Sequence, residues 1–349
     1  MVYAILHHPE NFAQRSGLFP LVQALGATPV FYDMTWERLQ KRSWTAGQWL
    51  RDWGVRHYGS TWNALVPWRD ERRLAREADA GAGDVVHFLW GEFAAPREPR
   101  RFNGRGAKIV GTFHCSARRQ PQVLGNFRCL QNFDRISVMS KSQIPFFVGR
   151  GFPAERIDVT LHGVDSEFFC PPAKEIVRGN DALNLLLVGS TERDHEFAAA
   201  VMGELRNDSV RLGVLTSKVN HAAYAGLGNV TILPFFNDEE LRDAYRNADL
   251  VFMPLLDCTA NNAVLEAMSC GTPVMTNRVG GIPEYVDAES NFVFDGKDAK
   301  NWADRIRAIN SSRAELAQRR IAVRAWAEKF SWRLVAPMFH DFNSRALAS

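Results

Sequence analysis

Short apolar runs that end in small or polar residues recur along the first half of the chain. They span 2–6, 29–32, 84–90, 108–114 and 135–140, with helical or irregular segments between them. Runs of this length and composition predict buried strands. Strands that alternate with helices predict a parallel sheet with helices on both faces, so the expected fold class is α/β.

A second series of the same kind fills the other half of the chain. Its apolar runs span 183–190, 210–216, 229–235, 250–256 and 272–277. Because 349 residues exceed what one ordinary core encloses, we predict two Rossmann-like domains. Residues 1–165 form the first domain, a proline-containing linker spans 166–182, and the second domain starts at 183. Two such domains form a cleft, a common place for a substrate.

Two helices of the second half have clear start signals. Asn237 precedes a run of acids, and Leu241 and Tyr245 lie four apart on one face, which predicts a helix capped by Asn237. A second helix is predicted to start near Asn262, capped by that residue or by Asn261. Gly271 ends it, and the proline that follows prevents its continuation.

Composition narrows the class of protein. Hydrophobic residues make up 46% of the chain and charged residues 23%, as in soluble globular proteins. The net charge of +3 is small, and we predict no nucleic-acid partner. The sequence has five cysteines without a C-x-x-C pair, which indicates free thiols, and its start is too short for a signal peptide. It has no apolar run long enough to span a membrane, so we expect a cytoplasmic protein.

Two local biases in the sequence each allow an ordinary structural interpretation and, as the alternative, a surface for anionic or lipid partners. Arginines gather between 97 and 119, either as a solvated face or as a site for an anionic substrate or membrane. Tryptophans gather with arginines between 35 and 80, where ordinary packing competes with a peripheral contact to the inner membrane or a lipid-linked acceptor. These tryptophans are Trp36, Trp44, Trp49, Trp53, Trp62 and Trp68.

The predicted helix near Asn262 carries groups near its start that could bind a ligand. Glu266 lies in the first turn or just after it, where the helix dipole stabilises a carboxylate. The backbone N–H groups of Ala263 and Val264 can bind a phosphate. A carboxylate beside a phosphate site is placed to accept hydrogen bonds from ribose hydroxyls. An acid near a helix start also occurs for stability alone, so both interpretations stay open.

The same stretch resembles the retaining glycosyltransferases of family 4. Their signature P-x-x-x-E-G-F-G-L-x-x-L-E-A-M-A-x-G-x-P-V is followed by G-G-x-x-E. Segments 135–143, 156–172 and 330–339 resemble other landmarks of that family in the expected order. The resemblance implies a GT-B fold, with a C-terminal helix over 326–349 that packs back on the first domain and ends the second at 325. The signature is matched by Pro254, Leu265, Glu266, Ala267, Met268, Gly271, Pro273, Val274, Gly280, Gly281 and Glu284.

The chain departs from the family pattern at two places. Cys258 stands where the family has the first of two acids, so Asp257, or Asn261 and Asn262, are the alternative contacts to the donor sugar. The family's phosphate-binding Arg directly follows a strand-end Gly. Here Gly189 is followed by three other residues before Arg193, to which we assign the phosphate role, against a surface ion pair as the alternative. No lysine matches the family's second phosphate contact.

The resemblance also implies the remaining site residues. His114, at the end of an apolar run in the first domain, corresponds to a His that faces the donor sugar. Glu92 and Arg118 are weaker candidates for contact with the acceptor. Gly280 and Gly281 let the backbone approach the donor, and the donor-binding set includes Ala263, Val264, Leu265 and Glu266.

The expected activity is transfer of a sugar from a UDP- or GDP-linked donor to a glycan, glycolipid or other acceptor. The family retains anomeric configuration, so retention is implied here. The chain has no D-x-D motif, and Arg193 with helix amides can stabilise a departing diphosphate, so we predict no metal and no cofactor. The alternatives are a sugar-nucleotide epimerase, or a degenerate relative that binds a nucleotide sugar or a partner glycosyltransferase without turnover.

Overall fold

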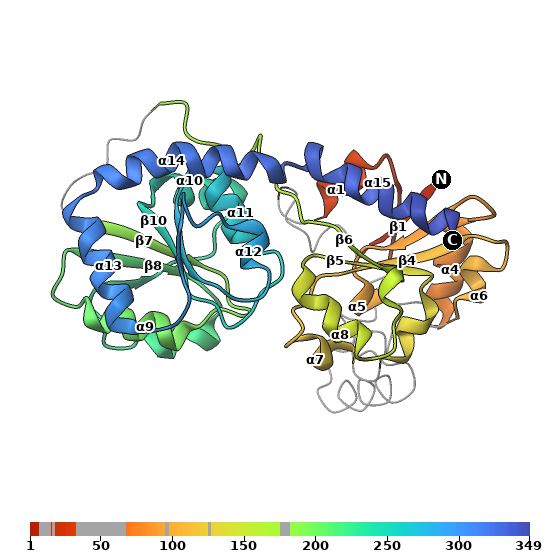
Figure 1. Cartoon of the computed structure of the whole chain (residues 1–349), viewed down its shortest axis with the longest axis horizontal. Coiled ribbons are helices and arrows are strands. Elements are labelled where there is room, and N and C mark those ends of the chain that lie inside the picture. The colour runs from red at the N-terminus through yellow and green to blue at the C-terminus, as the bar shows by residue number, and fades with distance from the viewer. Residues whose placement is uncertain (7–14, 16–17, 33–67, 95–97, 125–126, 175–181) are drawn as a thin grey trace. The chain divides into compact units, whose positions relative to one another are not determined.

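The computed structural model describes residues 1–6, 15, 18–32, 68–94, 98–124, 127–174 and 182–349 (Figure 1). They divide into two compact units. Unit 1 comprises Met1–His162 and Trp332–Ser349, and unit 2 comprises Gly163–Ser331. Most of the tryptophan-rich segment, up to residue 67, and the linker residues 175–181 lie outside the described residues.

Unit 1 contains a six-stranded parallel sheet in the order β2-β1-β3-β4-β5-β6. Five of these strands confirm the predicted apolar runs. The sixth, β6, was missed because its short half-buried stretch has no long apolar run. The strands are β1 (Val2–Leu6), β2 (Thr28–Phe31), β3 (Val85–Phe88), β4 (Lys108–Phe113), β5 (Arg135–Val138) and β6 (Ile157–Val159).

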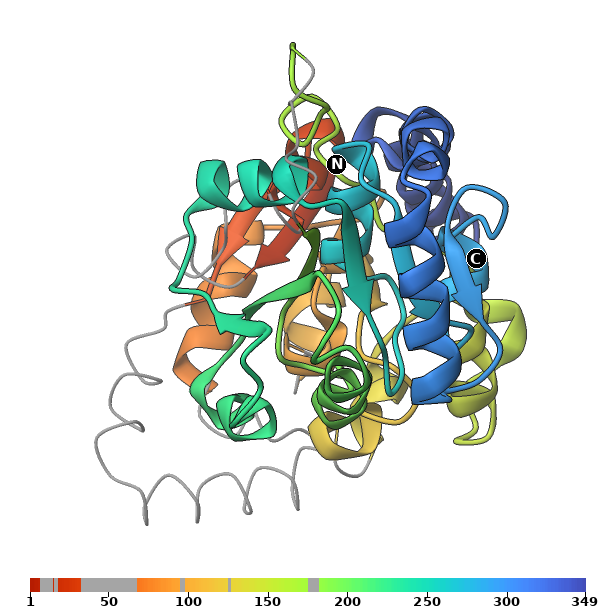
Figure 2. The same cartoon turned by 90° about the vertical axis from the view of Figure 1, so that its left-hand side faces the viewer.

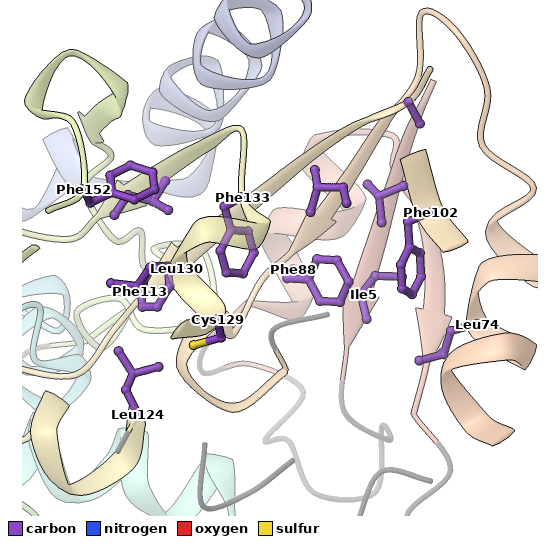
Figure 3. Packing of buried hydrophobic residues seen from close by; sticks show 14 of the residues in the cluster. Ile5, Leu74, Phe88, Phe102, Phe113, Leu124, Cys129, Leu130, Phe133 and Phe152 are labelled. Carbon is purple, nitrogen blue, oxygen red and sulfur yellow. The ribbon is translucent and has the colours of Figure 1, made fainter. Parts of the chain in front are cut away.

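Helices cover both faces of this sheet. One face packs on a core of large side chains, including Phe88, Phe113 and Phe133, with Leu74 of α4 and Phe102 of α6 (Figure 3). The elements on this side include α4 (Trp68–Ala78), α5 (Gly91–Ala94), α6 (Arg100–Asn103), α7 (Gln120–Leu124) and α8 (Ile144–Val148).

The C-terminal helix α15 (Trp332–Ala348) belongs to unit 1 and packs on β3, β4 and α1 (Phe19–Ala24). Phe342 and Ala346 of α15 contact Val85 and Val110 of the strands. Burying these apolar side chains stabilises the sheet face opposite α4 and α6.

Unit 2 contains a second six-stranded parallel sheet, in the order β12-β11-β10-β7-β8-β9. The five apolar runs predicted for this half of the chain correspond to β7, β8, β9, β10 and β11. The two parallel sheets confirm the predicted α/β class. The strands are β7 (Leu183–Val188), β8 (Val210–Leu215), β9 (Val230–Ile232), β10 (Leu250–Met253), β11 (Val274–Asn277) and β12 (Phe292–Phe294).

Figure 1 shows α9 and α13 on one face of this sheet and α10, α11 and α14 on the other. Figure 2 shows the same layers with unit 2 toward the viewer. Trp302 of α13 is fully buried against Phe252 and Phe294. The helices are α9 (His195–Glu204), α10 (Asp238–Asn247), α11 (Asn262–Ser269), α12 (Ile282–Tyr285), α13 (Ala299–Ser311) and α14 (Ala314–Ala327).

The predicted helix starts are confirmed. Asn237 caps α10 in a capping box with Glu240, and Asn261 caps α11. The far end of α11 is held from α14, where Arg324 donates to the backbone oxygens of Ser269 at 2.6 Å and Phe169 at 3.1 Å. The helix is therefore fixed at both ends.

Two further predictions concern the whole chain. The five cysteines are free thiols, as predicted. Among the described helices, none is long and apolar enough to cross a membrane.

Candidate functional site

The order of the unit 2 strands indicates where a candidate ligand site lies. From β7 the chain builds the sheet to one side through β8 and β9, and β10 starts the other side. In open α/β sheets, ligands bind outside the carboxyl ends of the strands at this reversal of strand order. The loops there are 189–194 after β7 and 254–261 after β10.

These two loops are joined by backbone contacts. The amide of Asp194 donates to the oxygen of Pro254 and that of Leu256 to the oxygen of Glu192, each at 2.9 Å. Arg193 and Leu255 form an isolated antiparallel bridge. The turn requires left-handed backbone at Glu192, with φ of 60°. The loops therefore form one unit that fixes the position of Arg193.

The guanidinium of Arg193 is surrounded by neutral acceptors. It donates to the backbone oxygens of Val188 at 3.1 Å and Thr191 at 2.7 Å, and to Oδ1 of Asn261 at 3.0 Å. A Cβ at Gly189 would lie 2.8 Å from Nε of Arg193, so only glycine leaves room for this side chain.

Within the described structure, Arg193 forms no ion pair with Asp194 or Glu196, the alternative considered for it. Asp194 pairs with Lys297 instead and caps α9. Burial lowers the pKa of Arg193, while Tyr245, Cys258, Glu266 and other groups raise it. Arginine is not deprotonated in proteins, so the loops hold a cation whose hydrogen-bond partners among the described residues are all uncharged.

Asn261 connects this cation to the start of α11. Its Oδ1 accepts from Arg193 and from the amide of Val264, the latter at 3.4 Å. Its side chain is 5% exposed, and within the part of the chain that is described its Nδ2 has no hydrogen-bond acceptor. Leaving a buried donor unpaired costs about 1–3 kcal/mol. An oxygen atom of a bound ligand would supply the missing acceptor.

The amide of Val264 is not available in the way the sequence predicted. It donates to the side chain and backbone oxygens of Asn261, because Asn261 is the N-cap. Ala263, in the same first turn, has no such contact recorded among the described residues. The donors left for a phosphate at this helix start are therefore Asn261 Nδ2 and the Ala263 amide, because the cap already uses the Val264 amide. Leu265 is buried on α11, and Asn262 is half-buried at its first position.

Glu266 lies one turn into α11 and is buried. Its Oε2 accepts from the hydroxyl of Tyr245 on α10 at 2.9 Å. Burial raises the pKa of Tyr245 well above its usual value, and the Glu266 carboxylate raises it further, so the phenol stays protonated and donates. Sequence reasoning placed Tyr245 only on an apolar helix face. The link to Glu266, on the next helix, had no sequence signal.

Cys258, at the position of the missing acid, is a buried thiol. Burial raises its pKa to about 12, so it is neutral and does not replace a carboxylate. The neighbouring Asp257 uses Oδ1 to accept from the amide of Cys258 at 2.8 Å. This contact fixes the loop and leaves the second oxygen of Asp257 as the one for other partners.

Gly280 and Gly281 contact this loop. The amide of Gly281 donates to the oxygen of Cys258 at 2.9 Å. Gly280 has φ of 52°, and a Cβ there would lie 2.0 Å from the same oxygen. The sequence attributed these glycines to close approach of a donor. The structure shows that Gly280 is required by the protein's own loop packing.

In unit 1 the predicted residues Glu92 and His114 lie at the carboxyl ends of the adjacent strands β3 and β4. Oε1 of the fully buried Glu92 accepts from the amides of His114 and Cys115, each at 2.7 Å. Burial raises the pKa of this carboxyl. Glu92 therefore braces the loop after β4, a role that the sequence did not indicate, and its contact with an acceptor stays a prediction.

His114 is held as a neutral ring. Its Nε2 lies 2.6 Å from the backbone oxygen of Leu89, so this nitrogen donates. Desolvation lowers the pKa of His114 to about 3, and His162 lowers it further. The ring packs at a tilt against Trp90, with centroids 4.2 Å apart and an interplanar angle of 33°. Arg118, the other acceptor-side candidate, is exposed before α7.

The structure thus gathers the predicted residues into two sets, one in each unit. The unit 2 set joins Gly189, Arg193, Asn261 and the start of α11, with Glu266 behind them. Such a set of fixed donors can bind a diphosphate. Among the described residues, no three His, Cys, Asp or Glu side chains are grouped so as to hold a metal ion.

Comparison with known proteins supports one family. The model of the family described as glycosyl transferases group 1 matches residues 147–311, slightly less than half of the chain. Over this region the chain is similar to the group 1 glycosyltransferases. D-inositol 3-phosphate glycosyltransferase from Arthrobacter sp. is 27% identical over 76% of this chain and 71% of its own length. The enzyme of that name from Saccharomonospora viridis is 35% identical, but over only 38% of this chain and 31% of its own length.

Solved structures of the GT-B type match this chain over almost its whole length. Sucrose-phosphate synthase from Thermosynechococcus elongatus has a TM-score of 0.73 at 15% identity, covering 100% of both chains. HepE from Anabaena, in complex with UDP and glucose, has a TM-score of 0.72 at 14% identity, covering 98% of this chain and 100% of that chain. At these identities the likeness shows the fold, and the predicted GT-B fold is confirmed.

Proposed function

We propose that this chain is a glycosyltransferase that moves a sugar from a nucleotide-diphosphate donor to an acceptor, with the donor bound in unit 2. One observation supports this most. A charged Arg193 with only neutral partners lies beside a buried Asn261 whose Nδ2 has no acceptor in the described structure. A diphosphate would supply negative charge to pair with Arg193 and an acceptor oxygen for Asn261 Nδ2.

The chemistry follows from these groups. When the bond between the anomeric carbon and the diphosphate breaks, negative charge grows on the departing oxygen. Fixed donors aimed at that charge lower the barrier. Arg193, Asn261 Nδ2 and the Ala263 amide are such donors, so we propose a metal-independent reaction. Retention of configuration is proposed from the family resemblance alone.

Other residues complete the proposed donor site. Glu266, held by Tyr245, accepts hydrogen bonds from the ribose, and Asp257 and Asn262 contact the sugar. HepE was solved with UDP and with UDP-glucose, which supports a uridine nucleotide, with GDP as the alternative. We further propose that unit 1 supplies the acceptor contacts, including the neutral His114, and that the acceptor is a glycan, a glycolipid or another lipid-linked molecule. The protein would act in the cytoplasm.

The first experiment is the thermal shift of the purified protein with UDP, GDP, ADP and their common sugar conjugates. A ligand that binds only the folded protein raises its stability, so one nucleotide should raise the melting temperature. Arg193→Gln should abolish the shift. Arg206→Gln is the matched control, because Arg206 is exposed and, among the described residues, its side chain donates only to the oxygen of Gly203. Absence of any shift would contradict the proposal.

The metal-independent step has its own test. Donor consumption should continue in EDTA at its original rate, measured as release of the nucleoside diphosphate. Strict dependence on an added divalent ion would contradict the role given to Arg193.

Cys258 favours a second candidate, a relative that binds the nucleotide sugar without turnover. The buried neutral thiol removes one of the two family carboxylates. Cys258→Glu distinguishes the two: a large gain in transfer supports the degenerate relative, whereas no gain or a loss supports an active variant site. Cys258→Gln controls for size.

A further inference from the structure

Unit 1 has an open groove of about 690 Å³ between α4 and α6. The two helices lie side by side (Figure 1). Five arginines and a single aspartate line it, along with small residues. The charged residues are Arg72, Arg76, Arg100, Arg101, Arg105 and Asp79. A volume of this size is typical of small-molecule sites.

The local carboxylates do not neutralise this groove. Arg105 pairs with Asp79, but the two side chains are 71% and 68% exposed, so the pair is weak. Arg101 pairs with Glu98 beside the groove. For Arg76 and Arg100 no carboxylate partner is recorded among the described residues. Arg76 and Arg100 therefore give the groove an excess of positive charge, whose field attracts anions.

The groove is separate from the candidate sites already described. The end of α4 leads to the start of β3, and the residues after α6 lead to the start of β4. The groove residues at Asp79 and Arg105 thus lie toward the amino ends of these strands. Glu92 and His114 lie at the carboxyl ends of the same strands, the edge where ligands of α/β sheets bind.

We propose that this groove binds a ligand with two or more phosphate groups. Guanidinium forks pair with phosphate oxygens through two parallel hydrogen bonds, and several arginines around one cavity hold several phosphates. The phosphates come either from a soluble anion or from the headgroups of an acidic lipid. The proposal does not depend on the donor site in unit 2.

The test compares two double variants of equal charge change. Arg76→Gln/Arg100→Gln removes the two groove arginines without a carboxylate partner. Arg206→Gln/Arg211→Gln removes two exposed arginines of unit 2. Each is titrated with inorganic tripolyphosphate by calorimetry, in the wild-type and Arg193→Gln backgrounds, so that binding at the donor site is separated. Each is also sedimented with phosphatidylcholine vesicles with and without phosphatidylglycerol.

The groove variant should weaken binding at least about tenfold, because each charge-assisted hydrogen bond contributes measurably, and the control should not. Binding should also weaken as salt rises. Loss of tripolyphosphate binding assigns a soluble anion, and loss of sedimentation with acidic vesicles alone assigns a lipid headgroup. Equal losses in both variants, unchanged binding in the groove variant, or no binding by the parent protein would overturn the proposal.

Discussion

The strand-end loops of the two units differ in how they treat charge. In unit 2, the loops after β7 and β10 surround the charged Arg193 with uncharged oxygens and leave an amide donor of Asn261 unpaired. In unit 1, the loops after β3 and β4 hold His114 as a neutral ring and raise the pKa of Glu92. One region holds a cation among uncharged oxygens, and the other holds a neutral imidazole.

The difference agrees with the two proposed roles, donor binding in unit 2 and acceptor contacts in unit 1. A diphosphate leaving group needs fixed positive charge, whereas a hydroxyl acceptor or a sugar needs neutral donors and acceptors. In unit 2 the two loops are joined by backbone hydrogen bonds, whereas in unit 1 they are joined through the side chains of Glu92 and His114.

The largest expected effect is at the cation. Arg193→Met should lower the turnover number by about 10²–10³, the loss seen when one donor to developing negative charge is removed. His114→Gln should have a much smaller effect, since no charge is lost. The measurement is the initial rate of release of the nucleoside diphosphate, with Arg206→Met as the control. Equal losses in the Arg193 and His114 variants would erase the contrast between the units.

The next effect concerns the loop contact that supports the unit 2 site. Gly280→Ala should lower the free energy of unfolding by about 3 kcal/mol, the upper end for overpacking, because its Cβ would meet the oxygen of Cys258. Gly228→Ala is the control, because nothing lies within 4 Å of a Cβ there. Urea unfolding measures both, and similar values for the two variants would show that the loops adjust freely.

The neutral histidines of unit 1 predict a pH effect. Burial lowers the pKa of His87, in β3, to about 3. The unfolded chain therefore binds the proton more readily, and stability is complete above the usual histidine pKa of about 6.5 and falls as pH drops below it. At pH 5 the loss from His87 is about 2 kcal/mol.

His87→Gln removes this titration. The variant should lose less stability between neutral pH and pH ~5 than the wild-type protein, by the amount that the His87 pKa implies. Urea unfolding at several pH values makes the comparison, with exposed His340→Gln on α15 as the control. Parallel pH profiles for wild type and His87→Gln would refute the buried neutral state.

The smallest effect separates two helix caps of unit 2. Asn237→Ala should cost about 1 kcal/mol of stability through the lost capping box and leave nucleotide binding unchanged. Asn261→Ala should lower both stability and nucleotide affinity, because Asn261 also accepts from Arg193. Thermal unfolding with and without nucleotide measures both. A drop in affinity for Asn237→Ala would mean that cap loss alone weakens the site.

Local signals predicted much of the fold. The buried strands and the caps at Asn237 and Asn261 were predictable because strand burial and capping act over a few residues. The edge strands β6 and β12 were not, since most of their side chains are only half-buried. Short edge elements obtain their stability from the neighbouring strand, which the local sequence does not describe.

The candidate site was predictable by residue type but not by contact. Arg193 was assigned a phosphate role, yet its partner Asn261 is 68 positions away and no short pattern joins them. The contact between Tyr245 and Glu266 and the position of Gly280 against Cys258 also arise from packing between separate loops or helices. These relations depend on tertiary structure, so only the folded chain reveals them.

The hold of Arg324 on the rear of α11 has a consequence for how such a protein diversifies. Because Arg324 fixes the C-terminal end of α11, the helix should keep its axis when the preceding loop is mutated. We expect that residues from Asp257 to Ala260 can be substituted while Asn261 and Arg193 keep their positions. Under the proposed function, this loop would determine which sugar is bound, while the helix and Arg193 would keep their positions. A library randomised over those few codons would explore new donors without searching again for a fold.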